Sequence, residues 1–177
     1  FCAGGDVRAV WEAGKSGGSL TREFFREEYI LNRRIHTLSK PYIAFLDGIT
    51  MGSGVGLSVH GSHRIVTETT MFAMPETAIG LFPDVGGSWF LNRCPGEVGM
   101  YLALTGARLK AADSIAAGIG TDYVSSTRMT ELEQALQTAD WSGGDAEDIV
   151  DAVIARFTED AGPAGLKDNM ATIDRCF

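Results

Sequence analysis

Two carboxylates in the middle of the chain could transfer protons. Residues 75–87 read Pro-Glu-Thr-Ala-Ile-Gly-Leu-Phe-Pro-Asp-Val-Gly-Gly, so Glu76 and Asp84 each follow a proline in apolar surroundings. Because proline fixes its own φ and extends the residue before it, we expect an ordered loop here rather than the interior of a helix. Loss of hydration raises the pKa of an acid toward values useful for acid–base catalysis. Both acids are therefore candidate catalytic groups; the alternative is that they only cap backbone N–H groups.

A glycine-rich turn upstream could bind an anion. Tyr42–Leu46 is a short apolar run bounded by Pro41 and Asp47, which predicts a buried strand. The segment Gly52-Ser-Gly-Val-Gly56 then leads into a helical stretch, and this order presents backbone N–H groups to an anion or a developing oxyanion. Leucine at position 57 removes the third glycine of the dinucleotide fingerprint. Close packing of a strand against a helix explains these glycines equally well.

A third acid and two histidines are further candidates. Apolar residues recur on one face of Leu20–Leu38, which predicts a helix. Adjacent Glu27 and Glu28 point in directions about 100° apart on it, so one can face inward, although the pattern alone favours two solvated acids. His60 and His63 are three residues apart, but no third metal ligand has a suitable spacing. We interpret both histidines as structural.

Length and composition limit the classes of protein. A chain of 177 residues suits one domain with a real core, and its formal charge of −8 disfavours nucleic acid as a partner. No apolar run approaches the roughly 20 residues that cross a membrane. Three cysteines, far apart, argue against a disulfide framework or a thiolate metal site and fit a reducing compartment. The opening residues lack a signal-peptide pattern and an initiator methionine, so we expect a fragment of a longer protein.

The remaining patterns predict mostly short elements. Asp6 is a suitable N-cap for a helix over 7–13. Short strands are expected at 63–67, 71–74 and 123–124, and helices at 87–94, 97–104, 111–117, 128–139, 146–158 and in a last stretch to 176. Strands alternating with helices, followed by helices alone, imply an α/β core and then a helical region.

Three segments together resemble the crotonase (enoyl-CoA hydratase/isomerase) superfamily: Phe1-Cys-Ala-Gly-Gly-Asp6, Gly52–Gly56, and Pro75-Glu76 with Pro83-Asp-Val-Gly-Gly87. The chain is most similar to its 3-hydroxyisobutyryl-CoA hydrolase branch, through Phe25-Arg-Glu-Glu-Tyr29, Gly61, Phe72–Gly87 and Leu104-Thr-Gly106. The resemblance covers nearly the whole chain. It implies an α/β fold with a ββα spiral core in residues 1–125 and a helical region of the same domain in 126–177, truncated at both ends relative to the family.

The resemblance also implies roles for particular residues. The family polarises a thioester carbonyl between two backbone N–H groups, here those of Gly5 and Ser53. Serine replaces the usual glycine at position 53, and its amide donor survives the change. Hydratases carry one acid in the helix of the turn, where this chain has Gly56, whereas the hydrolase branch pairs Glu76 with Asp84. Glu28 is similar to the substrate-contacting glutamate of that branch.

The implied activity is hydrolysis of a short branched β-hydroxyacyl-CoA, 3-hydroxyisobutyryl-CoA, in valine catabolism. The alternatives are a hydratase or isomerase that uses Glu76 alone, and a non-catalytic acyl-CoA-binding or scaffold protein. We expect no metal and no cofactor beyond the coenzyme A of the substrate, and neither nucleic acid nor membrane as a partner. Homo-oligomer formation is left open, as is the choice between the bacterial cytoplasm and the mitochondrial matrix.

Overall fold

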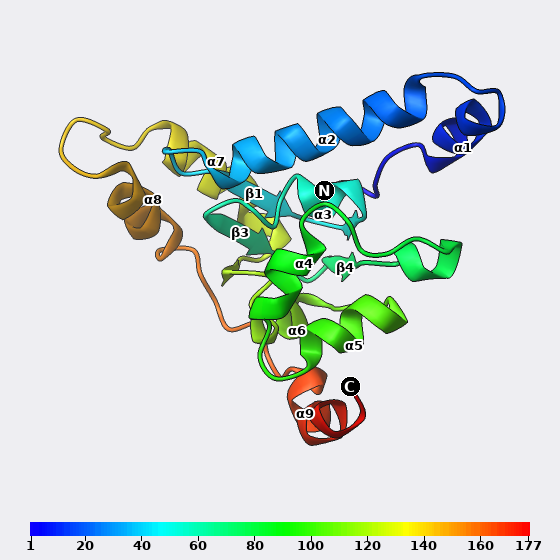
Figure 1. Ribbon diagram of the computed structural model, residues 1–177. Coiled ribbons are helices and arrows are strands. Elements are labelled where there is room, and N and C mark those ends of the chain that lie inside the picture. Colours follow the sequence, from blue (N-terminus) through cyan, green and yellow to red (C-terminus); the bar gives the residue numbers. More distant parts are fainter.

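The computed structural model describes all residues from Phe1 to Phe177 (Figure 1). The nine α-helices are α1 Val7–Lys15, α2 Leu20–His36, α3 Ser53–Gly56, α4 Gly87–Phe90, α5 Val98–Thr105, α6 Ala111–Ala116, α7 Met129–Gln137, α8 Ala146–Ile154 and α9 Gly165–Cys176. The five strands are β1 Ile43–Leu46, β2 Ile49–Met51, β3 His63–Val66, β4 Met71–Ala73 and β5 Asp122–Tyr123. Three short 3₁₀ helices are η1 Glu76–Ile79, η2 Leu91–Arg93 and η3 Ser126–Arg128. None of the helices combines the length and the apolar character that crossing a membrane requires.

The strands form two small parallel sheets between which the chain alternates. One sheet has the order β1-β3-β5 and the other pairs β2 with β4. Ile43 pairs with His63 in the first sheet and Ile49 with Met71 in the second. Two consecutive strands therefore go to different sheets before a helix or helical turn follows. This repetition is the ββα spiral that the resemblance implied.

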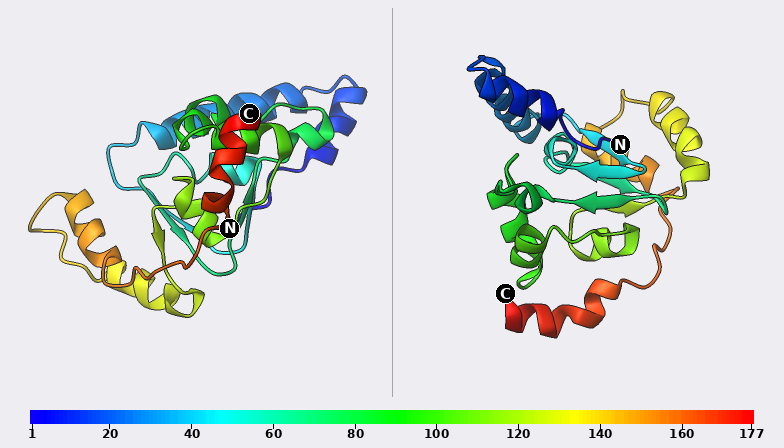
Figure 2. Two further views of the ribbon diagram at one scale, coloured as in Figure 1. Left: turned by 90° about the horizontal axis from the view of Figure 1, so that it is seen from below. Right: turned by 90° about the vertical axis from the view of Figure 1, so that its right-hand side faces the viewer.

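Two large hydrophobic cores hold the strands against the helices. The larger one joins α3 and β4 to α4, α5 and α9, with Phe72, Met74 and Leu102 almost fully buried. The other packs β3 against α7 and α8 through Ile65 and Leu132. The helices after residue 125 therefore divide between the cores: α7 and α8 lie beside the first sheet and α9 lies on the far side of the molecule from α2 (Figures 1 and 2).

Most expected elements are present, with two differences. Strand β2 was not predicted, because a run of three residues between Gly48 and Gly52 is too short to give a pattern. The segment after Pro75 is not loop throughout, because Glu76–Ile79 makes a 3₁₀ turn that ends at left-handed Gly80. Elsewhere the ends shift by a few residues; α8, for example, stops at Ile154 rather than at 158.

Candidate active site

One cavity of about 300 Å³ brings together all five residues that the sequence singled out. They come from five parts of the chain: the segment before α1, helix α2, the start of α3, helix η1 and the loop before α4. The cavity wall is otherwise mainly apolar, and its members include Val7, Val10, Phe24, Phe25, Ile79 and Leu81. Polar groups gathered in an apolar cavity of this size are typical of a site for a small organic ligand.

Two backbone turns meet at one end of the cavity. The Met51 N–H donates to the Cys2 carbonyl at 3.0 Å, so the opening segment runs alongside β2 and reaches the start of α3. A Cβ added at Gly54 would lie 2.0 Å from the same carbonyl oxygen, which shows how closely the two segments approach. Only glycine fits there.

The amides of Gly5 and Ser53 are available as donors. Ser53 is the first residue of α3, so its N–H has no intrahelical acceptor. The positive φ of this turn, 52°, falls on Gly52, so position 53 does not need a glycine. The Gly5 N–H donates to Ser53 Oγ at 3.2 Å, a long bond that a stronger acceptor can replace. A Cβ at Gly5 would stand 2.6 Å from the ring of Phe24, which explains the glycine. The serine at position 53 therefore leaves both amides in place.

Glu76 is the most desolvated acid of the site. It is 6% exposed, and its Oε2 has no hydrogen-bond partner. Burial raises its pKa to about 7, and the negative charges of Asp84 and Glu28 add to this, against the effect of its own backbone N–H. Its Oε1 lies beside Gly52, 3.4 Å from where a Cβ would stand. A carboxyl group with such a pKa can both accept and return a proton near neutral pH.

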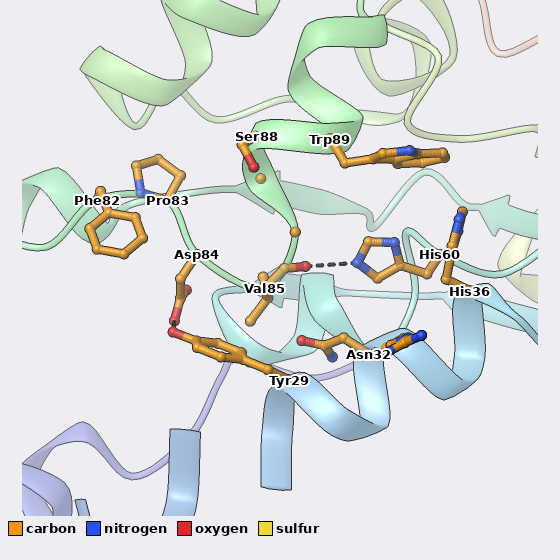
Figure 3. Close-up of a pocket in the computed structure, with 13 residues that line it drawn as sticks. Tyr29, Asn32, His36, His60, Phe82, Pro83, Asp84, Val85, Ser88 and Trp89 are labelled. Carbon is orange, nitrogen blue, oxygen red and sulfur yellow. Dashed lines mark hydrogen bonds between the residues drawn. The ribbon is translucent and has the colours of Figure 1, made fainter. Parts of the chain in front are cut away.

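Asp84 is held by a hydrogen bond from helix α2. It is 9% exposed and accepts a 2.8 Å bond at Oδ2 from the hydroxyl of Tyr29 (Figure 3). The next residue, Val85, has φ 43°, an unusual value for a β-branched side chain. His60 Nε2 donates to the Val85 carbonyl at 2.7 Å, which helps to hold this turn. Asp84 thus enters the cavity from a tightly determined loop.

Of the two adjacent acids on α2, only Glu28 faces the cavity. The side chain of Glu27 is about 70% exposed, whereas Glu28 is half-buried beside Ser53 and Asp84. Burial raises the pKa of Glu28, the Ser53 side chain opposes this by hydrogen bonding, and the charge of Asp84 adds to it. The expectation from helical pattern alone, two solvated acids, was wrong for Glu28.

The two histidines are engaged within the protein. His60 bonds to Val85 as described, and His63 lies 2.9 Å from both Ser62 Oγ and Asp151 Oδ1. These contacts are of the kind expected of structural histidines. No group of three His, Cys, Asp or Glu side chains is arranged to hold a metal ion.

A second cavity, of about 450 Å³, is also lined by Asp84 (Figure 3). The sequence had indicated no role for three residues that line this second cavity, namely Tyr29, Asn32 and Val85. A Cβ at Gly56 would stand 2.7 Å from both Asn32 Nδ2 and Val85 Cβ. Position 56 therefore has no room for a side chain. No local pattern could have indicated that Gly56 contacts Asn32 and Val85, because these three residues are far apart in sequence.

The chain matches known proteins over its full length. The model of the family described as "Enoyl-CoA hydratase/isomerase" matches residues 1–177. Curated relatives named "3-hydroxyisobutyryl-CoA hydrolase, mitochondrial" include one from Xenopus laevis, 54% identical over 100% of this chain and 46% of its own length. Another, from Xenopus tropicalis, is 65% identical over 77% of this chain and 35% of its own length.

Solved structures agree on the fold. A carnitinyl-CoA dehydratase from Mycobacterium thermoresistibile superposes with a TM-score of 0.88 at 41% identity, covering 99% of this chain and 49% of that one. An enoyl-CoA hydratase from Rhodobacter sphaeroides gives 0.87 at 40% identity, covering 100% and 49%. The chain thus spans about half, or less, of the length of these proteins. On the family match over residues 1–177, which the ββα spiral supports, the chain belongs to the enoyl-CoA hydratase/isomerase family.

Proposed function

We propose that the protein carrying this chain hydrolyses a short branched β-hydroxyacyl-CoA, 3-hydroxyisobutyryl-CoA, to the free acid and coenzyme A in valine catabolism. The observation that carries the proposal is the convergence of two acids, Glu76 and Asp84, with the backbone donors of Gly5 and Ser53 around one cavity. The names of the curated relatives support the choice of substrate.

The Gly5 and Ser53 amides bind the thioester oxygen and stabilise the negative charge that develops on it. Removing one such donor costs about 10²–10³ in kcat in other enzymes. Because neither amide needs a side chain for this role, the serine at position 53 is compatible with it. Glu76 Oε1 lies beside Gly52, the residue before Ser53. An acyl carbonyl bound to the Ser53 amide is therefore close to a carboxyl group with a pKa of about 7.

Glu76 delivers the nucleophile by one of two routes. As a general base it takes a proton from water while the water oxygen attacks the carbonyl carbon; the C–S bond then breaks, and Glu76 returns the proton to the thiolate. As a nucleophile its oxygen attacks the carbonyl carbon directly, coenzyme A leaves, and water opens the resulting anhydride. Asp84 holds the water or assists proton transfer in either route. Neither route needs a cofactor beyond the coenzyme A of the substrate.

Glu28 positions the acyl group. Its half-buried carboxyl group can accept a hydrogen bond from a β-hydroxyl, and the Phe24 and Phe25 rings beside it offer an apolar wall for a methyl branch. A cavity of about 300 Å³ suits a short acyl chain.

A hydratase or isomerase is the second candidate, since solved neighbours at about 40% identity are described as a dehydratase and a hydratase. Alkene hydration in this family uses an acid in the helix of the turn. Gly56 stands at that position here, and Asn32 and Val85 fill the space around it. This packing favours the hydrolase. A non-catalytic acyl-CoA-binding protein is the third candidate, and it predicts binding without turnover.

Paired assays on the intact protein test the proposal. 3-Hydroxyisobutyryl-CoA and crotonyl-CoA are offered separately, with release of free thiol and loss of the enoyl absorbance as the two signals. Thiol release from the first substrate alone supports the hydrolase, and it should be lost in Glu76→Gln. Near-wild-type hydrolysis by Glu76→Gln would overturn the assignment. A single turnover in H₂¹⁸O separates the routes, because direct attack by Glu76 leaves some first-turnover product unlabelled.

We place the protein in the mitochondrial matrix, on the names of the curated relatives; a bacterial source would place it in the cytoplasm instead. Cell fractionation decides between the two. Whether copies associate into a homo-oligomer is tested by light scattering on the intact protein.

A further inference from the structure

Tyr29 and Asp84 form the wall between the two cavities. Tyr29 lies on α2 and lines the larger cavity (Figure 3), while its neighbour Glu28 lines the smaller one. Asp84 lines both. The Tyr29 hydroxyl donates to Asp84 Oδ2 at 2.8 Å, a short bond between residues 55 positions apart. The other oxygen of Asp84 makes no hydrogen bond within the protein, so it is available to a ligand or water.

The charges around Asp84 make this bond important. Glu76 on η1 and Glu28 on α2 both line the smaller cavity with it, and like charges at close range favour the neutral form of a carboxyl group. Arg33 and His36 line the larger cavity from α2, but neither forms an ion pair with Asp84. His60 is occupied by the Val85 carbonyl.

Tyr29 is therefore the one protein group that donates a hydrogen bond to the Asp84 carboxylate. Such a bond favours the ionised form of the acceptor. In return, burial together with the neighbouring carboxylates raises the pKa of Tyr29, so the phenol keeps its proton and remains a donor throughout the physiological range.

We propose that Tyr29 is a positioning residue of the thioesterase site: its hydroxyl fixes the orientation of the Asp84 carboxyl group in the smaller cavity. Glu76 is then left as the group that takes up and releases the proton. This inference rests on the proposed function and divides the roles of its two acids.

Tyr29→Phe removes the hydroxyl and keeps the ring. We expect kcat to fall about tenfold or more with KM little changed, because Tyr29 acts on Asp84 rather than on substrate. Tyr101→Phe is the matched control, since the Tyr101 ring packs on Phe177 and its hydroxyl makes no hydrogen bond.

A double-mutant cycle gives the sharpest test. If Tyr29 acts through Asp84, adding Tyr29→Phe to Asp84→Asn should cost almost nothing further. Wild-type kcat in Tyr29→Phe, or an additive loss in the double variant, would overturn the inference. Near-wild-type hydrolysis by Glu76→Gln, in contrast, refutes the proposed function and leaves the double-mutant cycle to decide on Tyr29.

Discussion

Replacing Glu76 by glutamine should abolish thioester hydrolysis. It should also stabilise the fold, and this stabilisation should appear only at neutral and alkaline pH. The wild-type carboxyl group is buried, one of its oxygens lacks a partner, and its pKa is raised to about 7 from an ordinary value of 4.5. A carboxyl group with a raised pKa in the folded state binds its proton more tightly there than in the unfolded chain. Unfolding is therefore favoured once the proton is lost.

The size and the pH range follow from that shift. Below pH 4.5 the group is protonated in both states and has no effect on stability. Between pH 4.5 and 7 the unfolded chain loses its proton first, so the free energy of unfolding falls, and above pH 7 the loss is complete. A shift of about 2.5 units corresponds to about 3 kcal/mol, and screening by water at the cavity mouth reduces this to about 1–3 kcal/mol.

Urea unfolding of the wild type and Glu76→Gln at pH 4.5 and pH 8 measures this difference. We expect nearly equal stability at pH 4.5 and a more stable variant at pH 8, together with a fall in kcat of at least 10². Glu133→Gln, a change at an exposed acid on α7, is the control and should show no such pH dependence. Equal stability of Glu76→Gln and the wild type at both pH values would refute the idea that Glu76 is desolvated.

Three further changes test other parts of the site. Ser53→Gly should keep most activity. Ser53→Pro deletes the N–H donor at a helix position that tolerates proline, and it should lower kcat about 10²–10³-fold. Equal effects of the two substitutions on kcat would exclude a backbone donor at position 53. Glu28→Gln should impair hydroxyacyl substrates more than an unsubstituted acyl-CoA, while Glu27→Gln, its exposed neighbour, should change neither. Gly56→Ala should destabilise the fold by about 1–3 kcal/mol in thermal unfolding, because its Cβ meets Asn32; an unchanged Tm would show that the site can expand.

Local signals in the sequence predicted local structure. Asp6 caps α1 by accepting the Ala9 N–H at 3.0 Å, as its position before the helix indicated. Gly106 ends α5 with φ 62°, which few other residues adopt without strain. Strand β2 gave no such signal, since its three residues acquire their order from pairing with β4 rather than from their own pattern.

The site itself was predictable only in part. The two acids and the two glycine-rich turns stand out in the sequence, but which face of α2 turns inward depends on where that helix docks. Periodicity therefore could not choose between Glu27 and Glu28, and only the family resemblance selected Glu28. Tyr29 belongs to a segment that carries the family resemblance, but no pattern indicated its hydrogen bond to Asp84, because this bond spans 55 residues.

Two unfavourable features of this chain line the cavity of about 450 Å³ beside Asp84. Val85 is its one residue other than glycine with a positive φ, and the buried amide of Asn32 has no partner at either atom. Each such feature costs about 1–3 kcal/mol, and a fold keeps it where function requires it. A glycine at position 85 would relieve the strain, but it would leave empty the space beside Gly56 that the valine side chain fills. Hydrocarbon thus occupies the place next to the glycine-rich turn, and in the proposed mechanism the acid that works with Glu76 comes from position 84 instead of 56.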